Sequence, residues 1–180
     1  PMVSAEEAGD YGLRLTMENL VLDDAGWSLI DANGALDHTP VDVALDLGGK
    51  AKIDVLDLMM AGETGTAPTT TPELQTLDIR TLAIKALGAA ATGSGAFTFD
   101  NSMVAAGGPP LPVGTADVRL EGGNKLIDGL IAMGVITEED AMGARMMMAM
   151  FGKPEGDDVL TSKIEAREGG SIFVNGQQIQ

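Results

Sequence analysis

Apolar and polar residues alternate with a period of two along several stretches of the chain, which predicts strands with one buried face. The clearest alternation runs from Val41 to Leu47, and another covers residues 159–166. The same pattern predicts strands over 13–21, 27–37, 77–87, 89–99, 113–121 and 171–174, the last followed by a hairpin turn at Asn175-Gly176. Because such strands leave their other face in water, they are typical of an antiparallel sheet.

Apolar residues at helical spacing predict three helices, over 51–60, 124–134 and 138–151. Before the last of these, Thr137 offers an N-cap hydroxyl, and the acids at 138–140 complement the helix dipole. Gly152 and Pro154 end it. We therefore expect an α+β fold, in which a curved, mainly antiparallel sheet of eight or nine strands carries the helices on its concave face.

A weak internal duplication predicts how this fold is built. Residues 13–60 and 77–135 each follow the order strand, strand, strand, helix, and Gly48-Gly49 and Gly122-Gly123 end the third strand of each unit. Residues 61–72 are rich in Gly, Thr and Pro, which predicts a flexible link between the units. The whole chain, 1–180, is expected to form one domain, with a C-terminal helix and hairpin in 137–180.

The net charge of the chain limits the classes of partner that we expect for this domain. The 11 basic and 27 acidic residues give a formal charge of −16, which would repel nucleic acids and anionic membrane surfaces. Such acidity is typical of a highly solvated surface, and a dedicated cation site is the alternative. No apolar run approaches the roughly 20 residues of a membrane span, so we do not expect this segment to cross a bilayer.

Catalytic chemistry has few candidates. Cysteine is absent, which excludes thiolate nucleophiles and sulfur-ligated metals, and the single histidine, His38, is predicted to lie in a surface loop. The segment 88–95 is rich in glycine but lacks the Lys-Ser/Thr of a phosphate-binding loop. We therefore expect no catalytic residue, cofactor or resident metal, and a protein that is not an enzyme.

The acidic pairs are the remaining candidates for chemistry, and they lie at Asp23-Asp24, Glu138-Glu139-Asp140 and Asp157-Asp158. We expect them to serve turns and helix caps. A hydrolase that uses the acids at 138–140 is a third functional reading, behind the two given below. None of these acids follows a calcium-loop pattern, although the sequence leaves a loosely held calcium open.

Methionines are concentrated in the predicted helix 138–151. A flexible thioether adapts to apolar partners, so we take five residues as candidate contacts for an apolar ligand: Met142, Met146, Met147, Met150 and Phe151. The alternative is that these side chains face the core of the domain, because a helix packed on a sheet needs a broad apolar stripe.

Several short segments carry a resemblance to a known family. They lie at 93–101, 120–124, 126–127, 140–147, 169–171 and 175–176. In these segments the chain resembles the C-terminal half of the DUF2125 proteins of alphaproteobacteria, over roughly residues 75–180, and it is more distantly similar to AsmA-like and DUF945-like envelope proteins. The resemblance implies a periplasmic protein whose signal peptide and N-terminal part are missing from this chain, and it implies no activity.

Two functional hypotheses follow. The first is a non-enzymatic envelope protein that binds or shields a lipid or another apolar ligand between sheet and helices. The second is an interaction or assembly module that docks to another envelope protein through a sheet edge or the methionine-rich helix.

Overall fold

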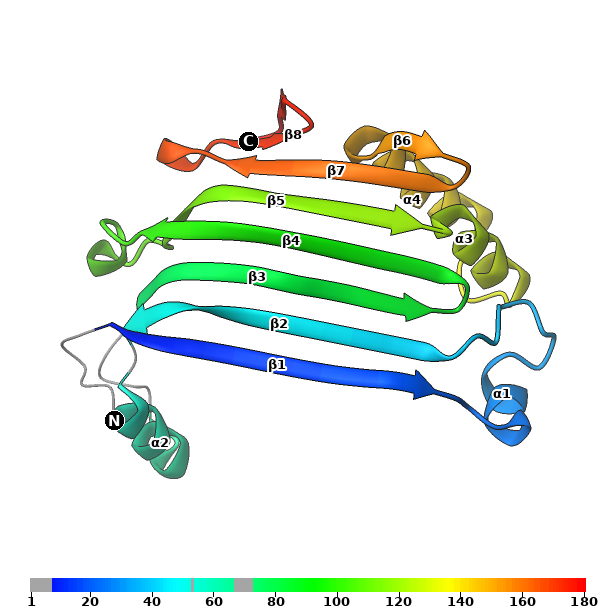
Figure 1. Cartoon of the computed structure of the whole chain (residues 1–180), viewed down its shortest axis with the longest axis horizontal. Coiled ribbons are helices and arrows are strands. Elements are labelled where there is room, and N and C mark those ends of the chain that lie inside the picture. Colours follow the sequence, from blue (N-terminus) through cyan, green and yellow to red (C-terminus); the bar gives the residue numbers. More distant parts are fainter. Residues whose placement is uncertain (1–7, 53, 67–72) are drawn as a thin grey trace.

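One antiparallel sheet forms the body of the molecule (Figure 1). The computed structural model describes residues 8–52, 54–66 and 73–180. The sheet has nine strands in the order β1-β2-β3-β4-β5-β7-β8-β9, with β6 also paired to β7. The strands are β1 (Gly9–Leu20), β2 (Val41–Lys52), β3 (Glu73–Ala86), β4 (Ala89–Asp100), β5 (Leu111–Glu121), β6 (Lys153–Gly156), β7 (Val159–Ala166), β8 (Ile172–Val174) and β9 (Gln177–Gln178).

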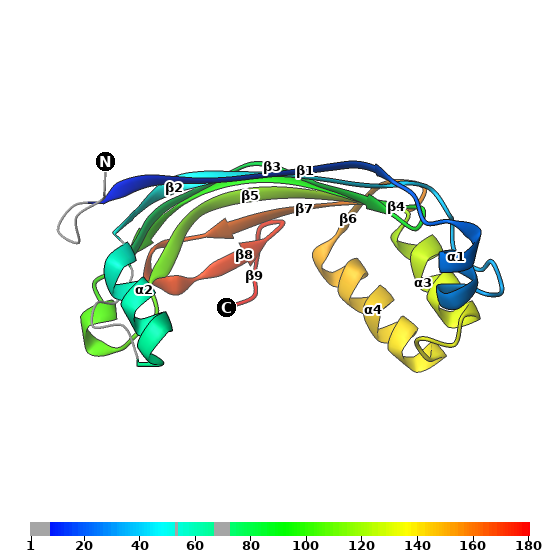
Figure 2. The same ribbon diagram turned by 90° about the horizontal axis from the view of Figure 1, so that it is seen from below.

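The sheet bends into an arch, and the helices lie on its concave side (Figure 2). They are α1 (Asp24–Ile30), α2 (Val55–Thr64), α3 (Gly123–Ala132) and α4 (Glu138–Phe151). Helix α2 lies at one end of the arch, and α1, α3 and α4 lie at the other end (Figure 2). The predicted fold class is confirmed, but the helices stand at the two ends of the concave side and leave its middle uncovered.

Helix caps explain why three of the helices begin where they do. Asp23 accepts the Gly26 amide at the start of α1, and Thr137 and Asp140 form a reciprocal capping box at the start of α4. The Asp158 carboxylate, in the turn between β6 and β7, accepts the backbone N–H groups of Asn124 and Lys125 in the first turn of α3. The predicted use of these acids in caps is confirmed.

The strand predicted over 27–37 is wrong. Residues 24–30 form α1, and the chain after it turns because the Asp31 carboxylate accepts the amides of Ala35 and Leu36 at 2.9 and 2.8 Å. Because this side chain binds backbone amides four and five residues ahead, the segment closes into a loop and does not pair as a strand. The first predicted unit therefore has the order strand, helix, strand, helix, and the duplication stays a prediction.

The pair Gly48-Gly49 does not end β2, which continues to Lys52. A Cβ on Gly49 would lie 2.1 Å from the carbonyl oxygen of Thr76, so glycine is needed here for close approach of β3 and not for a turn. The helix expected over 51–60 accordingly begins later, at Val55, and includes residues 61–64 of the predicted link. Residues 67–72 of that link lie outside the described residues.

The buried core is thin. In the part of the chain that the structure describes, no large side chain is fully buried, and the buried apolar residues are mostly alanines: Trp27, Ala51, Ala89, Ala116, Ile127, Ala141, Ala166 and Val174. A sheet ordinarily buries its apolar face against a second layer. Here no second layer covers the middle of the arch.

Candidate functional site

The concave side of the sheet can be assigned from contacts at the α4 end. Val118 and Leu120 of β5 and Leu160 of β7 share an apolar cavity of about 270 Å³ with side chains of α4. A Cβ on Gly123, at the start of α3, would touch Leu120. Because α3 and α4 lie on the concave side (Figure 2), these strand side chains point to that side as well.

Strand register extends this face across six strands, since directly paired residues point to the same side of a sheet. The first row is Met17, Val43, Ile84, Ala91, Leu120 and Leu160. The second is Leu15, Leu45, Leu82, Gly93, Val118 and Ser162, and the third is Leu13, Leu47, Ile79, Gly95, Ala116 and Ile164. The fourth is Tyr11, Gly49, Leu77, Phe97, Gly114 and Ala166. We call these four rows the inner face.

The inner face is apolar throughout. Its rows contain no charged residue, and its two hydroxyl groups have partners within the protein. The Tyr11 hydroxyl donates to the Thr76 carbonyl oxygen at 2.9 Å, and Ser162 Oγ donates to the Phe151 carbonyl oxygen at 2.5 Å. The face therefore offers hydrocarbon surface and hardly any hydrogen-bonding groups.

Much of this surface is accessible. Ile84, in the third strand of the sheet, is 43% exposed, and Leu13 and Leu15 on the edge strand are 55% and 48% exposed. With strands about 4.8 Å apart and residues about 3.4 Å apart, four rows over six strands measure roughly 24 by 20 Å. Soluble monomers rarely expose a contiguous apolar patch larger than a few hundred Å², and larger patches mark interaction or ligand-binding surfaces.

The structure separates the five residues that the sequence nominated. Met147 and Phe151 line the cavity between α4 and the inner face, together with Met148, which was not nominated. Met147 is nevertheless 60% exposed, and so are Met142, Met146 and Met150 at 63%, 61% and 58%, which lie outside the cavity lining. The helix thus has two apolar stripes, because Ala141, Met148 and Phe151 at spacings of seven and three pack inward while the second stripe faces solvent.

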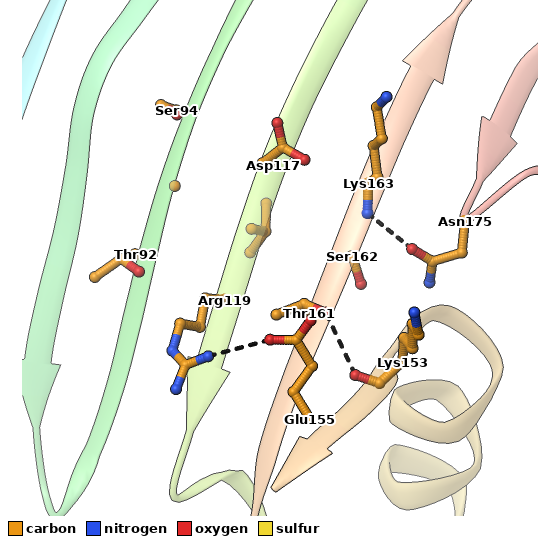
Figure 3. Close-up of a pocket in the computed structure, with 12 residues that line it drawn as sticks. Thr92, Ser94, Asp117, Arg119, Lys153, Glu155, Thr161, Ser162, Lys163 and Asn175 are labelled. Atoms are coloured by element: carbon orange, nitrogen blue, oxygen red, sulfur yellow. Dashed lines mark hydrogen bonds and ion pairs between the residues drawn. The ribbon is translucent and has the colours of Figure 1, made fainter.

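The convex face is polar. A hollow of about 670 Å³ on this face is lined by Thr92, Ser94, Asp117, Arg119, Glu155 and Lys163, among others (Figure 3). Arg119 is already paired with Glu121 at 2.7 Å and with Glu155 at 3.4 Å, and the Lys163 ammonium lies 3.3 Å from Glu165. The lining carries the cations Arg119, Lys153 and Lys163 and the anions Asp117 and Glu155, and two of the three cations are paired with glutamates.

A second charge cluster on the convex face joins three strands. Asp46 of β2 accepts hydrogen bonds from Arg80 at 2.7 Å and from Arg14 at 3.0 Å. These bonds, with that from Arg80 the stronger influence, hold the pKa of Asp46 below its usual value. The carboxylate is therefore a structural anchor for β1 and β3.

Sequence reasoning missed a cluster at the foot of α1. Asp31 is buried, and its carboxylate lies 2.9 Å from His38 Nε2 in addition to the two loop amides. The His38 ring stacks on Trp27 with ring centroids 3.9 Å apart. The hydrogen bond from the Leu36 amide, with further help from Ala35 and His38, lowers the pKa of Asp31 despite its burial. His38 lies in an exposed loop, as expected, and its hydrogen bond to Asp31 also helps to close this loop.

The described residues contain no group of three or more His, Asp or Glu side chains placed to hold a metal ion. They also contain no helix with the length and apolarity that a bilayer crossing requires.

One protein family matches most of this chain. The family described as "Uncharacterized protein conserved in bacteria (DUF2125)" matches residues 3–172. The chain belongs to this family. Membership of DUF2125 covers both halves of the chain, and so extends the resemblance noted for 75–180 into strands β1 and β2. No match was found among curated proteins or among solved structures.

Proposed function

We propose that this chain is a non-enzymatic protein of the bacterial envelope whose inner face binds the acyl chain of a lipid. The observation that carries the proposal is the inner face itself, four rows of uncharged residues that the helices leave uncovered in the middle of the arch. Burial of apolar surface contributes roughly 25 cal/mol per Å², so covering this face with hydrocarbon favours binding.

The chemistry of the inner face favours an acyl chain over a peptide strand. A strand laid across the face would leave backbone N–H and C=O groups without partners, because the rows supply almost no polar atoms. An acyl chain has no such groups. One chain spans half of the hydrocarbon core of a bilayer, about 15 Å, which fits within the roughly 20 Å length of the face.

The α4 end of the face supports the same assignment. There Met147, Met148 and Phe151 form a wall over the inner face, and thioether side chains adapt to flexible hydrocarbon. We therefore assign Met147 and Phe151 to the ligand site. Met142, Met146 and Met150 lie outside the cavity lining, on a side of α4 that faces solvent.

The location of the protein is a separate part of the proposal. A periplasmic protein is implied by the resemblance to envelope families, and a binding face for lipid suits that compartment. Osmotic-shock fractionation of cells that produce the natural full-length protein tests it. Recovery of the protein in the cytoplasmic fraction would refute the envelope assignment and leave the ligand assignment standing.

The binding test uses a dansyl-labelled fatty acid, whose emission rises in an apolar site. The unmodified chain should bind the probe saturably. Ile84→Glu places a carboxylate in the first row of the inner face, on the third of its six strands, and should weaken binding at least tenfold, since burying an unpaired charge costs several kcal/mol. Thr92→Glu adds the same charge on the convex side of the adjacent strand and should change affinity less than twofold.

Circular dichroism spectra should be the same for both variants, because both positions are exposed. Equal weakening by the two variants would contradict the assignment of the inner face. An absence of saturable binding, together with no lipid detected by mass spectrometry of gently purified protein, would overturn the proposal. The occupant would then be an amphipathic helix of a partner, which satisfies its own backbone groups.

A further inference from the structure

Strand β1 gives the sheet a long open edge. It is the first strand in the sheet order, it runs for 12 residues without proline, and its outer edge pairs with no described residue (Figure 1). The opposite side of the sheet ends in strands of three and two residues. Natural proteins shorten, bend or cover long edges, because an open row of N–H and C=O groups recruits other strands. The register shift between Met17 and Leu20 interrupts the end of β1, and residues 9–16 remain an open edge that can accept a partner strand.

We propose that β1 pairs with β1 of a second copy of this chain, antiparallel and about a two-fold axis at Gly12. In this register Asp10 of each copy lies opposite Arg14 of the other, so that two ion pairs form on the convex side. Tyr11 lies opposite Leu13 twice on the inner side. The strand is therefore complementary to itself in both charge and hydrophobicity.

The charges on β1 decide between registers. Arg14 is flanked at a distance of four residues by Asp10 and by Glu18. A two-fold axis at Arg14 would place the two guanidinium groups together and Asp10 against Glu18, which like-charge repulsion disfavours. Pairing Arg14 with Glu18 would place Leu13 opposite Asn19, whose φ of 54° departs from strand geometry.

The groups in the proposed ion pairs are accessible. The side chains of Asp10 and Arg14 are 86% and 76% exposed. Arg14 binds Asp46 through Nε and Nη2, and its Nη1 makes no hydrogen bond to another described residue. A guanidinium can therefore hold Asp46 within its own chain and Asp10 of the second copy together.

The two-fold axis determines how the inner faces of the two copies are oriented. A two-fold axis between antiparallel strands is perpendicular to the sheet, so both inner faces open on the same side. The exposed side chains of β1 then lie at the centre of one apolar surface that is twice as wide. The use of that surface for lipid rests on the proposed function, whereas the pairing of β1 does not.

Sedimentation equilibrium at 0.15 M salt, where charges are screened beyond about 8 Å, tests the pairing. The unmodified chain should form a dimer at micromolar concentration. Asp10→Arg should weaken it at least tenfold by setting Arg against Arg14. A monomer at 100 µM for the unmodified chain, or a dimer unaffected by Asp10→Arg, would overturn the proposal. The dansyl probe, measured on the Asp10→Arg monomer, reports separately on the ligand site.

The absence of cysteine from the chain allows a second test of register. Gly12→Cys should cross-link the dimer, since directly opposed Cα atoms lie about 4.5–5.5 Å apart, within disulfide range. The new side chain has room, because a Cβ on Gly12 meets only the Leu47 carbonyl oxygen, at 3.6 Å. Thr16→Cys is the control, since its two copies would lie roughly 27 Å apart. Cross-linking through Thr16→Cys and not through Gly12→Cys would refute the register.

Discussion

Gly114 of β5 tests how closely the strands of the arch approach one another. It pairs with Phe97 of β4, and a Cβ at this position would lie 2.1 Å from the Ala96 carbonyl oxygen and 2.8 Å from the Phe97 Cα. Both of those atoms belong to the backbone, so no side-chain rotation relieves the contact. Gly114→Ala must therefore push β4 and β5 apart by about 1 Å, because a Cβ essentially never lies within 3.0 Å of such an atom.

The loss of folding free energy caused by Gly114→Ala follows from this close contact. Overpacking costs about 1–3 kcal/mol, and a neighbouring ladder hydrogen bond that lengthens contributes about 1 kcal/mol more. We expect Gly114→Ala to lower the free energy of unfolding by about 2–4 kcal/mol. Gly12→Ala is the matched control on β1, where the nearest atom would be 3.6 Å away. It should be neutral or stabilising by about 0.5 kcal/mol, because alanine restricts the unfolded chain.

Urea unfolding followed by far-UV circular dichroism measures both changes. The two variants should share the slope of the unmodified chain and differ in midpoint, provided that unfolding is two-state. If Gly114→Ala unfolded at the same urea concentration as Gly12→Ala, the close approach of β4 and β5 would be refuted. The glycines of the inner face would then have no packing role.

Two further predictions concern the cluster at the foot of α1. Trp27→Ala removes a buried ring that stacks on His38, and it should lower the free energy of unfolding by about 3–5 kcal/mol. Urea unfolding followed by circular dichroism measures this change. A loss below about 1 kcal/mol would show that the stack contributes little. The lowered pKa of Asp31, caused first by the Leu36 amide, stabilises the fold above the unfolded pKa of about 3.9, and this stability is lost as pH falls through the folded pKa. Asp31→Asn should therefore flatten the acid side of a plot of urea midpoint against pH, and an unchanged slope would contradict the assigned hydrogen bonds.

Local pattern alone determined most of the strands of this protein. Alternation of apolar and polar residues predicted β7 over 159–166, and the glycine at 88 correctly separated β3 from β4. The caps of α4 could also be predicted, because Thr137 and Asp140 act on amides within three residues. In each case the deciding interaction lies within a few residues along the chain.

Other elements were decided by contacts that sequence spacing does not reveal. Residues 27–37 have the apolar content of a strand, but Asp31 binds loop amides, and the ring of Trp27 stacks on a histidine eleven residues later. Gly49 has the sequence context of a strand end. In the structure it lies inside β2, where a Cβ would be only 2.1 Å from the Thr76 carbonyl oxygen of β3. The sequence contains these residues but not the neighbours that give them their role.

Part of the candidate site could be predicted from the sequence, and part is revealed only by the tertiary structure. The methionines of α4 could be nominated from sequence, since their concentration in one helix is visible there, but the sequence did not show that Met147 lines the cavity and that Met142 does not. The inner face itself belongs to the tertiary structure alone. It exists because register aligns side chains from six strands and because the helices stand at the ends of the arch, and both depend on pairings between residues far apart in the chain.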